Sequence, residues 1–265
     1  MVSKLILAAL VSLSALAQNI NTHQGLKPFL SNASARISSG GSSSYPEDCT
    51  GAAACWKFDE ASGDIVDEIA GVTLTVTGSP TYNVTATDPF DLISPGITTG
   101  ANKAFIKNSL TTELAIGTAD ATIEFYYSTT QNSGSPILYE HDDEATNRGY
   151  YLSIAAATGV WTFAFTGGSS VNFNYTLPAD WNDGNIHKIR LGLNRTTELA
   201  ELWYDGVSQG TKDIAAITGA NIKAGLASFG AYPLAPSVAG FNGTIWFWRL
   251  TPLTATNNIG GPNGG

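Results

Sequence analysis

Residues 187–193 read HKIRLGL, and residues 199–206 read LAELWYDG. In the first stretch apolar side chains alternate with Lys188 and Arg190, which is the two-residue period of a strand with one buried face. The second stretch ends in Asp-Gly, a pair that favours the tight turn of a β-hairpin because both residues tolerate positive φ angles. The two stretches therefore predict antiparallel strands joined by short turns.

The same alternation recurs on both sides of this segment. Short runs are separated by Gly, Asn, Asp and Pro, and no long stretch has helical periodicity. Thr158-Gly159 is a hairpin turn signal between two of the runs. Many short antiparallel strands at this spacing predict a sandwich or a barrel. The clearest further runs are 122–128, 150–155, 160–166, 171–176 and 244–250.

The composition limits the kinds of partner. The chain has 265 residues, of which 43% are hydrophobic and 13% are charged, so a large core is combined with a surface of Ser, Thr, Asn and Gly. Lys plus Arg is 13 and Asp plus Glu is 22, which gives a net charge of -9. Binding to nucleic acid or to an anionic membrane depends on clustered cations, so we expect neither partner.

The two ends of the chain differ from its central block. Residues 1–17 carry Lys4, an apolar run and a small-x-small cleavage pattern, which is typical of a secretory signal peptide. Residues 18–45 are predicted to be a flexible linker or N-terminal arm, residues 46–254 the folded block, and residues 255–265 a Gly-rich tail. No other apolar run is long enough to span a membrane. We therefore expect a secreted, cell-surface or virion-surface protein with no membrane span in the mature chain.

Cys49 and Cys55 are the only two cysteines of the sequence. In an exported chain, an even pair at this short spacing predicts a disulfide. A zinc site needs about four ligands, and no His lies near this pair. The alternative is a pair of buried free thiols.

Five ordered stretches of the central block resemble the laminin-G-like branch of the concanavalin-A-like jelly rolls. The resemblance implies an all-β fold, a jelly-roll sandwich of two antiparallel sheets packed face to face. Members of this family are mostly binding modules for glycans or proteins, and many hold a calcium ion at the rim. The matching stretches are Cys55–Gly63, Leu114–Tyr126, Arg148–Ile154, Trp181–Lys188 with Leu202–Gly206, and Phe241–Ile245.

Residues 140–144 read EHDDE and are the sharpest local feature. The Glu-x-Asp-x-Glu spacing resembles the catalytic strand of related jelly-roll glycanases, in which Glu140 and Glu144 would supply the nucleophile and the proton donor. His141 and Asp143 stand where those enzymes have apolar residues, and the plainer alternative is a solvated acidic loop. Calcium is the one candidate cofactor, and its predicted oxygen ligands are Asp142, Asp143 and Glu144.

Aromatic rings are the candidate ligand-binding groups, because they stack on the flat apolar faces of sugars. The predicted sugar platform is Trp246, Trp248 and Trp161, with Trp181 and Trp203 as further candidates. The alternative for each ring is packing in the core. The last strand has two apolar faces, and strict alternation places Trp246 and Trp248 on the same one. One face is therefore expected to meet a neighbouring subunit, a ligand or a loop of this chain.

His187 invites a catalytic interpretation, because imidazole titrates near neutral pH. It follows Asp183-Gly184 at the spacing of the family's D-G-x-x-H turn, where the resemblance implies a structural role. The other two histidines, His23 and His141, lie far apart in the sequence. We therefore expect no histidine-based catalysis.

These observations favour a non-catalytic binding module that is exported or displayed on a surface and recognises a glycan or a surface protein. One alternative is a structural or decorating subunit of a filament, fibre or virion, which would associate with itself. A second alternative is a glycoside hydrolase that uses Glu140 and Glu144.

Overall fold

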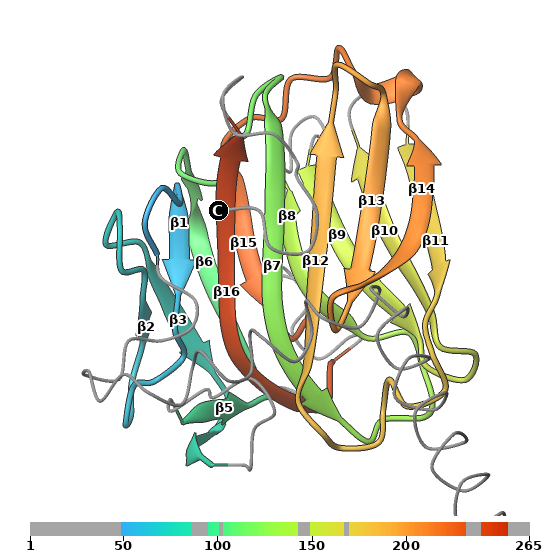
Figure 1. The fold of residues 1–265 in the computed structure, drawn as a ribbon. Coiled ribbons are helices and arrows are strands. Elements are labelled where there is room, and N and C mark those ends of the chain that lie inside the picture. The colour runs from blue at the N-terminus through green and yellow to red at the C-terminus, as the bar shows by residue number, and fades with distance from the viewer. Residues whose placement is uncertain are drawn as a thin grey trace, which may run out of the picture. The chain divides into compact units, whose positions relative to one another are not determined.

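The computed structural model describes residues 49–85, 95–100, 103–142, 149–166, 170–231 and 240–253. Two antiparallel sheets and one 3₁₀ turn, Ala215–Ile217, make up the regular structure of these ranges (Figure 1). The all-β, two-sheet sandwich is confirmed, and it is consistent with a jelly roll. Within these ranges no helix has the length and apolarity needed to cross a membrane. The predicted segments 1–17, 18–45 and 255–265 lie outside the described residues.

The first sheet forms the front layer of Figure 1 and carries the site described below. β1 (Ala54–Trp56) pairs with residues 248–250 of the last strand of the chain, β16 (Gly243–Leu253). The two longest strands of the sheet lie side by side at its centre and pair over their full length. In sheet order the strands are β14 (Val207–Asp213), β13 (Leu199–Tyr204), β12 (His187–Asn194), β7 (Asp120–Thr129), β16 (Gly243–Leu253), β5 (Gly96–Thr98) and β4 (Thr81–Val84).

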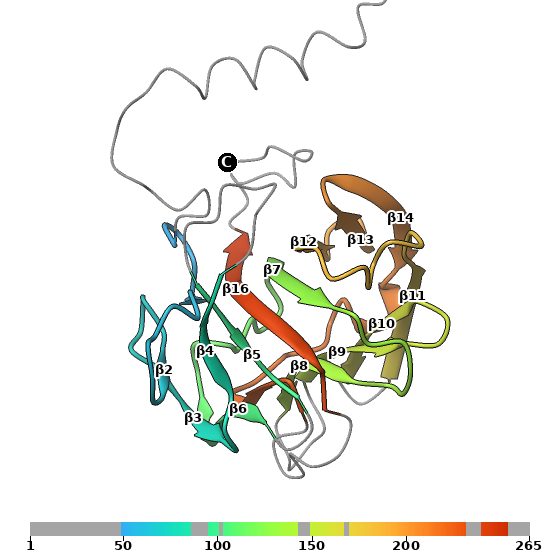
Figure 2. The same cartoon turned by 90° about the horizontal axis from the view of Figure 1, so that it is seen from below.

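The second sheet lies behind the first, and the view from below in Figure 2 separates the two layers. Four strands at one edge of this sheet follow one another in the chain, and the predicted turn at Thr158-Gly159 joins two of them; Gly159 has a φ of 64°. In sheet order the strands are β11 (Ser170–Thr176), β10 (Val160–Thr166), β9 (Gly149–Ala155), β8 (Ile137–Asp142), β15 (Gly225–Phe229), β6 (Ala104–Thr111), β3 (Thr73–Thr77) and β2 (Ile65–Val66).

The core between the sheets is rich in aromatic rings that meet from both layers. The Trp161 ring of β10 is stacked on Phe125 of β7, with centroids 5.7 Å apart. The Trp248 ring of β16 lies 4.7 Å from the Tyr139 ring of β8. Buried aromatic rings provide a large share of the apolar area that such a sandwich removes from water.

The closing strand β16 departs from strict alternation. Its register against β7 shifts between Ile245 and Phe247, which is a β-bulge. Trp248 points into the core together with Ile245. Trp246 and Phe247 pack in a separate apolar cluster on the other side of the sheet. The predicted placement of Trp246 and Trp248 on one face is therefore wrong, because one bulged residue inverts the alternation that follows it.

A disulfide-bonded segment covers that second apolar cluster. Cys49 and Cys55 are bonded, with Cα atoms 5.8 Å apart, so the predicted disulfide is confirmed. Buried Cys55 belongs to the cluster, and the partly buried Cys49, Ala52 and Val84 pack against it. The outer apolar face of β16 is thus covered by this chain itself, which was one of the predicted alternatives.

Candidate functional site

The three tryptophans of the predicted sugar platform are inaccessible. Trp161 is fully buried, while Trp246 and Trp248 are 2% and 1% exposed. An indole can stack on a sugar only through an accessible ring face. The prediction that these rings form a platform is therefore wrong in this fold, and the core-packing alternative describes Trp161 and Trp248.

The acidic stretch 140–144 begins in a strand rather than in a loop. Glu140 and His141 pair with β15 on one side and with β9 on the other. Glu140 is 7% exposed, and the fully buried His141 ring lies 5.0 Å from the Tyr150 ring. The solvated-loop interpretation is therefore wrong for these two residues, because pairing on both sides places them inside the second sheet.

The predicted calcium ligands are only partly placed. Asp142 is the last residue of β8, whereas Asp143 and Glu144 lie outside the described residues. In the parts of the chain that the structure describes, no three His, Cys, Asp or Glu residues are grouped as a metal site requires. Calcium binding and the paired chemistry of Glu140 and Glu144 stay predictions.

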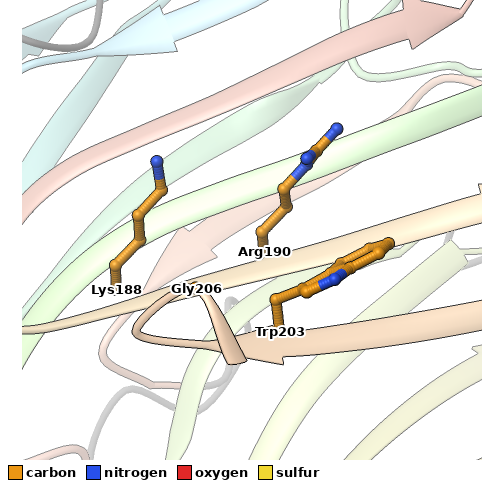
Figure 3. A pocket seen from close by; sticks show the side chains of 4 residues that line it. All are labelled: Lys188, Arg190, Trp203 and Gly206. Atoms are coloured by element: carbon orange, nitrogen blue, oxygen red, sulfur yellow. The ribbon is translucent and has the colours of Figure 1, made fainter. Parts of the chain in front are cut away.

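A small hollow lies on the outer face of β12 and β13, and of its lining residues only Trp203 was among the predicted candidates. Lys188, Arg190, Trp203 and Gly206 line it. Figure 3 shows the Lys188 and Arg190 side chains rising from the same side of β12. Strand alternation puts them there, because Ile189 between them points into the core.

Arg190 and Trp203 form the wall of this hollow. They are direct partners across the β12–β13 pair, and Arg190 Cζ lies 5.1 Å from the centroid of the Trp203 ring. This is the geometry of a cation–π contact. Trp203 is only 5% exposed, but it lies outside the core cluster between the sheets. Its ring therefore supports a guanidinium on the outer face instead of packing in the core.

Glu124 of β7 holds the cations next to the hollow. Its carboxylate accepts a hydrogen bond from Arg249 Nε at 2.6 Å and lies 3.2 Å from Lys188 Nζ. It is also the direct cross-strand partner of Arg190. Burial alone would raise the pKa of Glu124, but the charges of Lys188 and Arg249 outweigh burial and hold that pKa below its ordinary value. Glu124 is therefore a carboxylate at neutral pH.

A buried histidine fixes the turn beside the hollow. Asp205 and Gly206 have φ angles of 48° and 79°, as a type I′ hairpin turn requires. Asp205 Oδ1 accepts the backbone N–H of Lys188 at 2.7 Å, and its Oδ2 lies 2.8 Å from His187 Nδ1. On the other side of the ring, His187 Nε2 lies 3.1 Å from Asp183 Oδ1. His187 thus links the loop before β12 to the β13–β14 turn, which agrees with the structural role expected for it.

The protonated form of His187 suits this environment. Burial would lower the pKa of His187, but hydrogen bonds to Asp205 and Asp183 outweigh burial and raise the pKa above its ordinary value. An imidazolium donates from both nitrogens, so it can serve both carboxylates at once. We therefore expect the turn that carries Gly206 to respond to pH.

The residues that line the hollow suit binding better than bond cleavage. They offer an ammonium, a guanidinium, an indole and a glycine backbone. Among these four lining residues there is no pair of carboxylates and no nucleophile beside a base, the usual sets for hydrolysis. Hydrogen-bond donors held on a rigid sheet can instead recognise a polar or anionic ligand.

No protein-family model matches the sequence, and a search of curated proteins finds no relative. Solved structures of similar fold include the binding domain of botulinum neurotoxin DC in complex with rat synaptotagmin II, at 12% identity and a TM-score of 0.56, covering 77% of this chain and 49% of that chain. Another concerns botulinum neurotoxin type C, whose cell entry depends on interaction with two ganglioside molecules, at 12% identity and a TM-score of 0.55, covering 76% and 48%. The botulinum neurotoxin serotype G binding domain matches at 12% identity and a TM-score of 0.52, covering 77% and 49%. This chain spans about half the length of those structures, and the likeness shows a shared β-sandwich fold.

Proposed function

We propose that this chain is a non-catalytic binding module, exported or displayed on a surface, that recognises a glycan or a surface protein through the hollow on β12 and β13. The observation that carries the proposal is a ladder of side chains across four strands. Trp203, Arg190, Glu124 and Arg249 are successive cross-strand partners on β13, β12, β7 and β16. A rigid sheet that holds an aromatic ring and fixed cations loses little conformational entropy on binding.

The similar solved structures support a binding role. One is a binding domain in complex with synaptotagmin II, and another belongs to a toxin whose cell entry depends on ganglioside molecules. The ordered sequence stretches that resemble laminin-G-like jelly rolls point to the same class of function. These likenesses suggest glycan or protein as the partner, and the hollow supplies the candidate surface.

The two alternatives have less support. Self-association in a filament or virion rested in part on an uncovered apolar face of β16, and Trp246 and Phe247 are buried within this chain. A glycoside hydrolase would need Glu140 to reach its substrate, and Glu140 is 7% exposed in the middle of a sheet. Calcium at 142–144 remains part of the proposal and is tested by a chelator.

The test is a binding screen with matched variants. The wild-type chain, the double variant Arg190→Ala with Trp203→Ala, and the control Lys223→Ala are applied to a glycan array and to cells, with and without chelator. Lys223 is exposed and does not line the hollow. We expect wild type and control to bind a common ligand and the double variant, folded by circular dichroism, to lose it. Equal binding by all three would contradict the site, and no retention on either support would contradict the function.

A further inference from the structure

We propose that the hollow on β12 and β13 is an anion site that takes the carboxylate or sulfate group of an acidic glycan. This inference rests on the proposed binding function and narrows its ligand class. It is carried by the juxtaposition of three cationic side chains, Lys188, Arg190 and Arg249, around the carboxylate of Glu124 and beside an aromatic wall.

The outer face has a local excess of positive charge in an acidic protein. Lys188 and Arg249 both contact Glu124, and Arg190 faces it across the β7–β12 pair. One carboxylate therefore faces three cations, whereas the whole chain has a net charge of -9. Glu201, on the same outer face of β13, keeps its negative charge while it accepts a hydrogen bond from Ser208 of β14, so three cations stand against two carboxylates. The positive electrostatic potential over this face attracts anionic ligands and disfavours cationic ones.

The guanidinium is held in a defined orientation. The Trp203 ring lies under Arg190, with Cζ 5.1 Å from the ring centroid, and restricts the positions that the long side chain can adopt. A planar guanidinium pairs with a carboxylate or a sulfate through two parallel hydrogen bonds. Lys188, two residues earlier on the same face, has a side chain that is 23% exposed, so its ammonium can be reached from solvent. Two different cationic groups thus flank the space in which an anion would lie.

The size of the hollow favours a sugar over a peptide. Its enclosed space is only about 40 Å³, enough for a few water molecules or one small charged group. Pockets for drug-sized ligands are larger, about 300–1,000 Å³. Gly206 at the rim is exposed, and no atom lies within 4 Å of the position that a Cβ would take there. A carboxylate or sulfate group fits such a space while the sugar ring that carries it stays outside, whereas an extended acidic peptide would need a longer groove.

Titration calorimetry with paired probes tests the ligand class. The acidic probes are 3′-sialyllactose and a heparin tetrasaccharide, lactose is the neutral counterpart, and polyglutamate represents an acidic peptide. We expect at least one acidic probe to bind, and Lys188→Gln and Arg190→Gln each to weaken it about tenfold or more, the usual effect of losing a charge-assisted hydrogen bond. The control Lys223→Gln changes net charge equally but should stay within about twofold of wild type.

A variant that is expected to bind more tightly separates ligand recognition by the cations from a purely structural role of the same side chains. Glu124→Gln keeps the shape of the side chain but removes the carboxylate that competes for the cations, so we expect it to bind the acidic probe more tightly. A folded Glu124→Gln variant that binds it less tightly would contradict the anion site. Lactose binding as tightly as sialyllactose, polyglutamate being the preferred probe, or neither acidic probe binding would overturn this inference. The proposed function would survive those results if the array or the cells still retained the chain through the hollow.

Discussion

The closing strand β16 and the hairpin strand β13 belong to the same sheet but use tryptophan differently. On β16, Trp248 packs against Tyr139 in the core, and Trp246 packs in the outer cluster beside the disulfide. On β13, Trp203 lies outside the core and supports the guanidinium of Arg190. The cross-strand partner and the local register thus decide whether a strand tryptophan holds the fold or prepares a surface. Substitutions on the two strands test that difference.

The largest expected effect comes from truncating the two kinds of tryptophan. Trp248→Ala removes a fully surrounded indole and should lower the free energy of unfolding by about 3–5 kcal/mol. Trp203→Ala removes a ring that is 5% exposed and its cation–π contact, but no ring from the core between the sheets, so it should cost less, about 2–3 kcal/mol. Urea denaturation followed by far-ultraviolet circular dichroism measures both values. If Trp203→Ala cost as much as Trp248→Ala, the contrast between the two strands would be lost.

Removing the disulfide should affect the β16 side of the sheet and spare the hollow. Cys49→Ser with Cys55→Ser opens a short loop, and the chain-entropy model gives a loss of about 2 kcal/mol in the free energy of unfolding. Ligand binding at β12 and β13 should remain within about twofold of wild type where the variant is folded, since Cys55 packs on Trp246 and Phe247. A folded variant that no longer binds would show that the two regions are coupled.

The smallest expected effect is a pH dependence of stability at His187, beside the turn between β13 and β14. The pKa of His187 is raised in the folded chain, so its contribution to stability is complete below the ordinary histidine pKa of about 6.5 and is lost as pH rises through the folded value. Between pH 5.5 and 8.5 the melting temperature of wild type should fall relative to that of His187→Gln. Ligand affinity should fall in the same direction, because Asp205 holds both His187 and the turn that carries Gly206. Parallel melting curves for the two proteins across this range would contradict the prediction.

Most strands could be predicted from local alternation, and the exceptions have physical causes. The run 160–166 coincides with β10, and 187–193 covers nearly all of β12. The bulge in β16 could not be seen, because an inserted residue leaves apolar residues at every position and erases the period of two. The acidic end of β8 was misread because its partner β15 lies far away in the sequence, and that pairing buries Glu140 and His141.

Only part of the candidate site could be predicted from the sequence. Alternation already placed Lys188 and Arg190 on the outer face of one strand, and counting back from the turn between β12 and β13 would have paired Arg190 with Trp203. Their relation to Glu124 depends on the register between β7 and β12, which are separated by four strands of the other sheet. No local pattern carries that register, so the charge ladder became visible only in the fold.

The most direct test of a ligand site at β12 and β13 is a titration followed by the indole N–H signals of the six tryptophans in a two-dimensional ¹H–¹⁵N spectrum. The titrant is the tightest-binding glycan of the array. We predict a progressive shift of the Trp203 signal, because a ligand that contacts Arg190 changes the environment of the ring beneath it. The signals of the buried Trp161 and Trp248 should stay in place. A Trp203 signal that does not move while the glycan is bound would contradict the account.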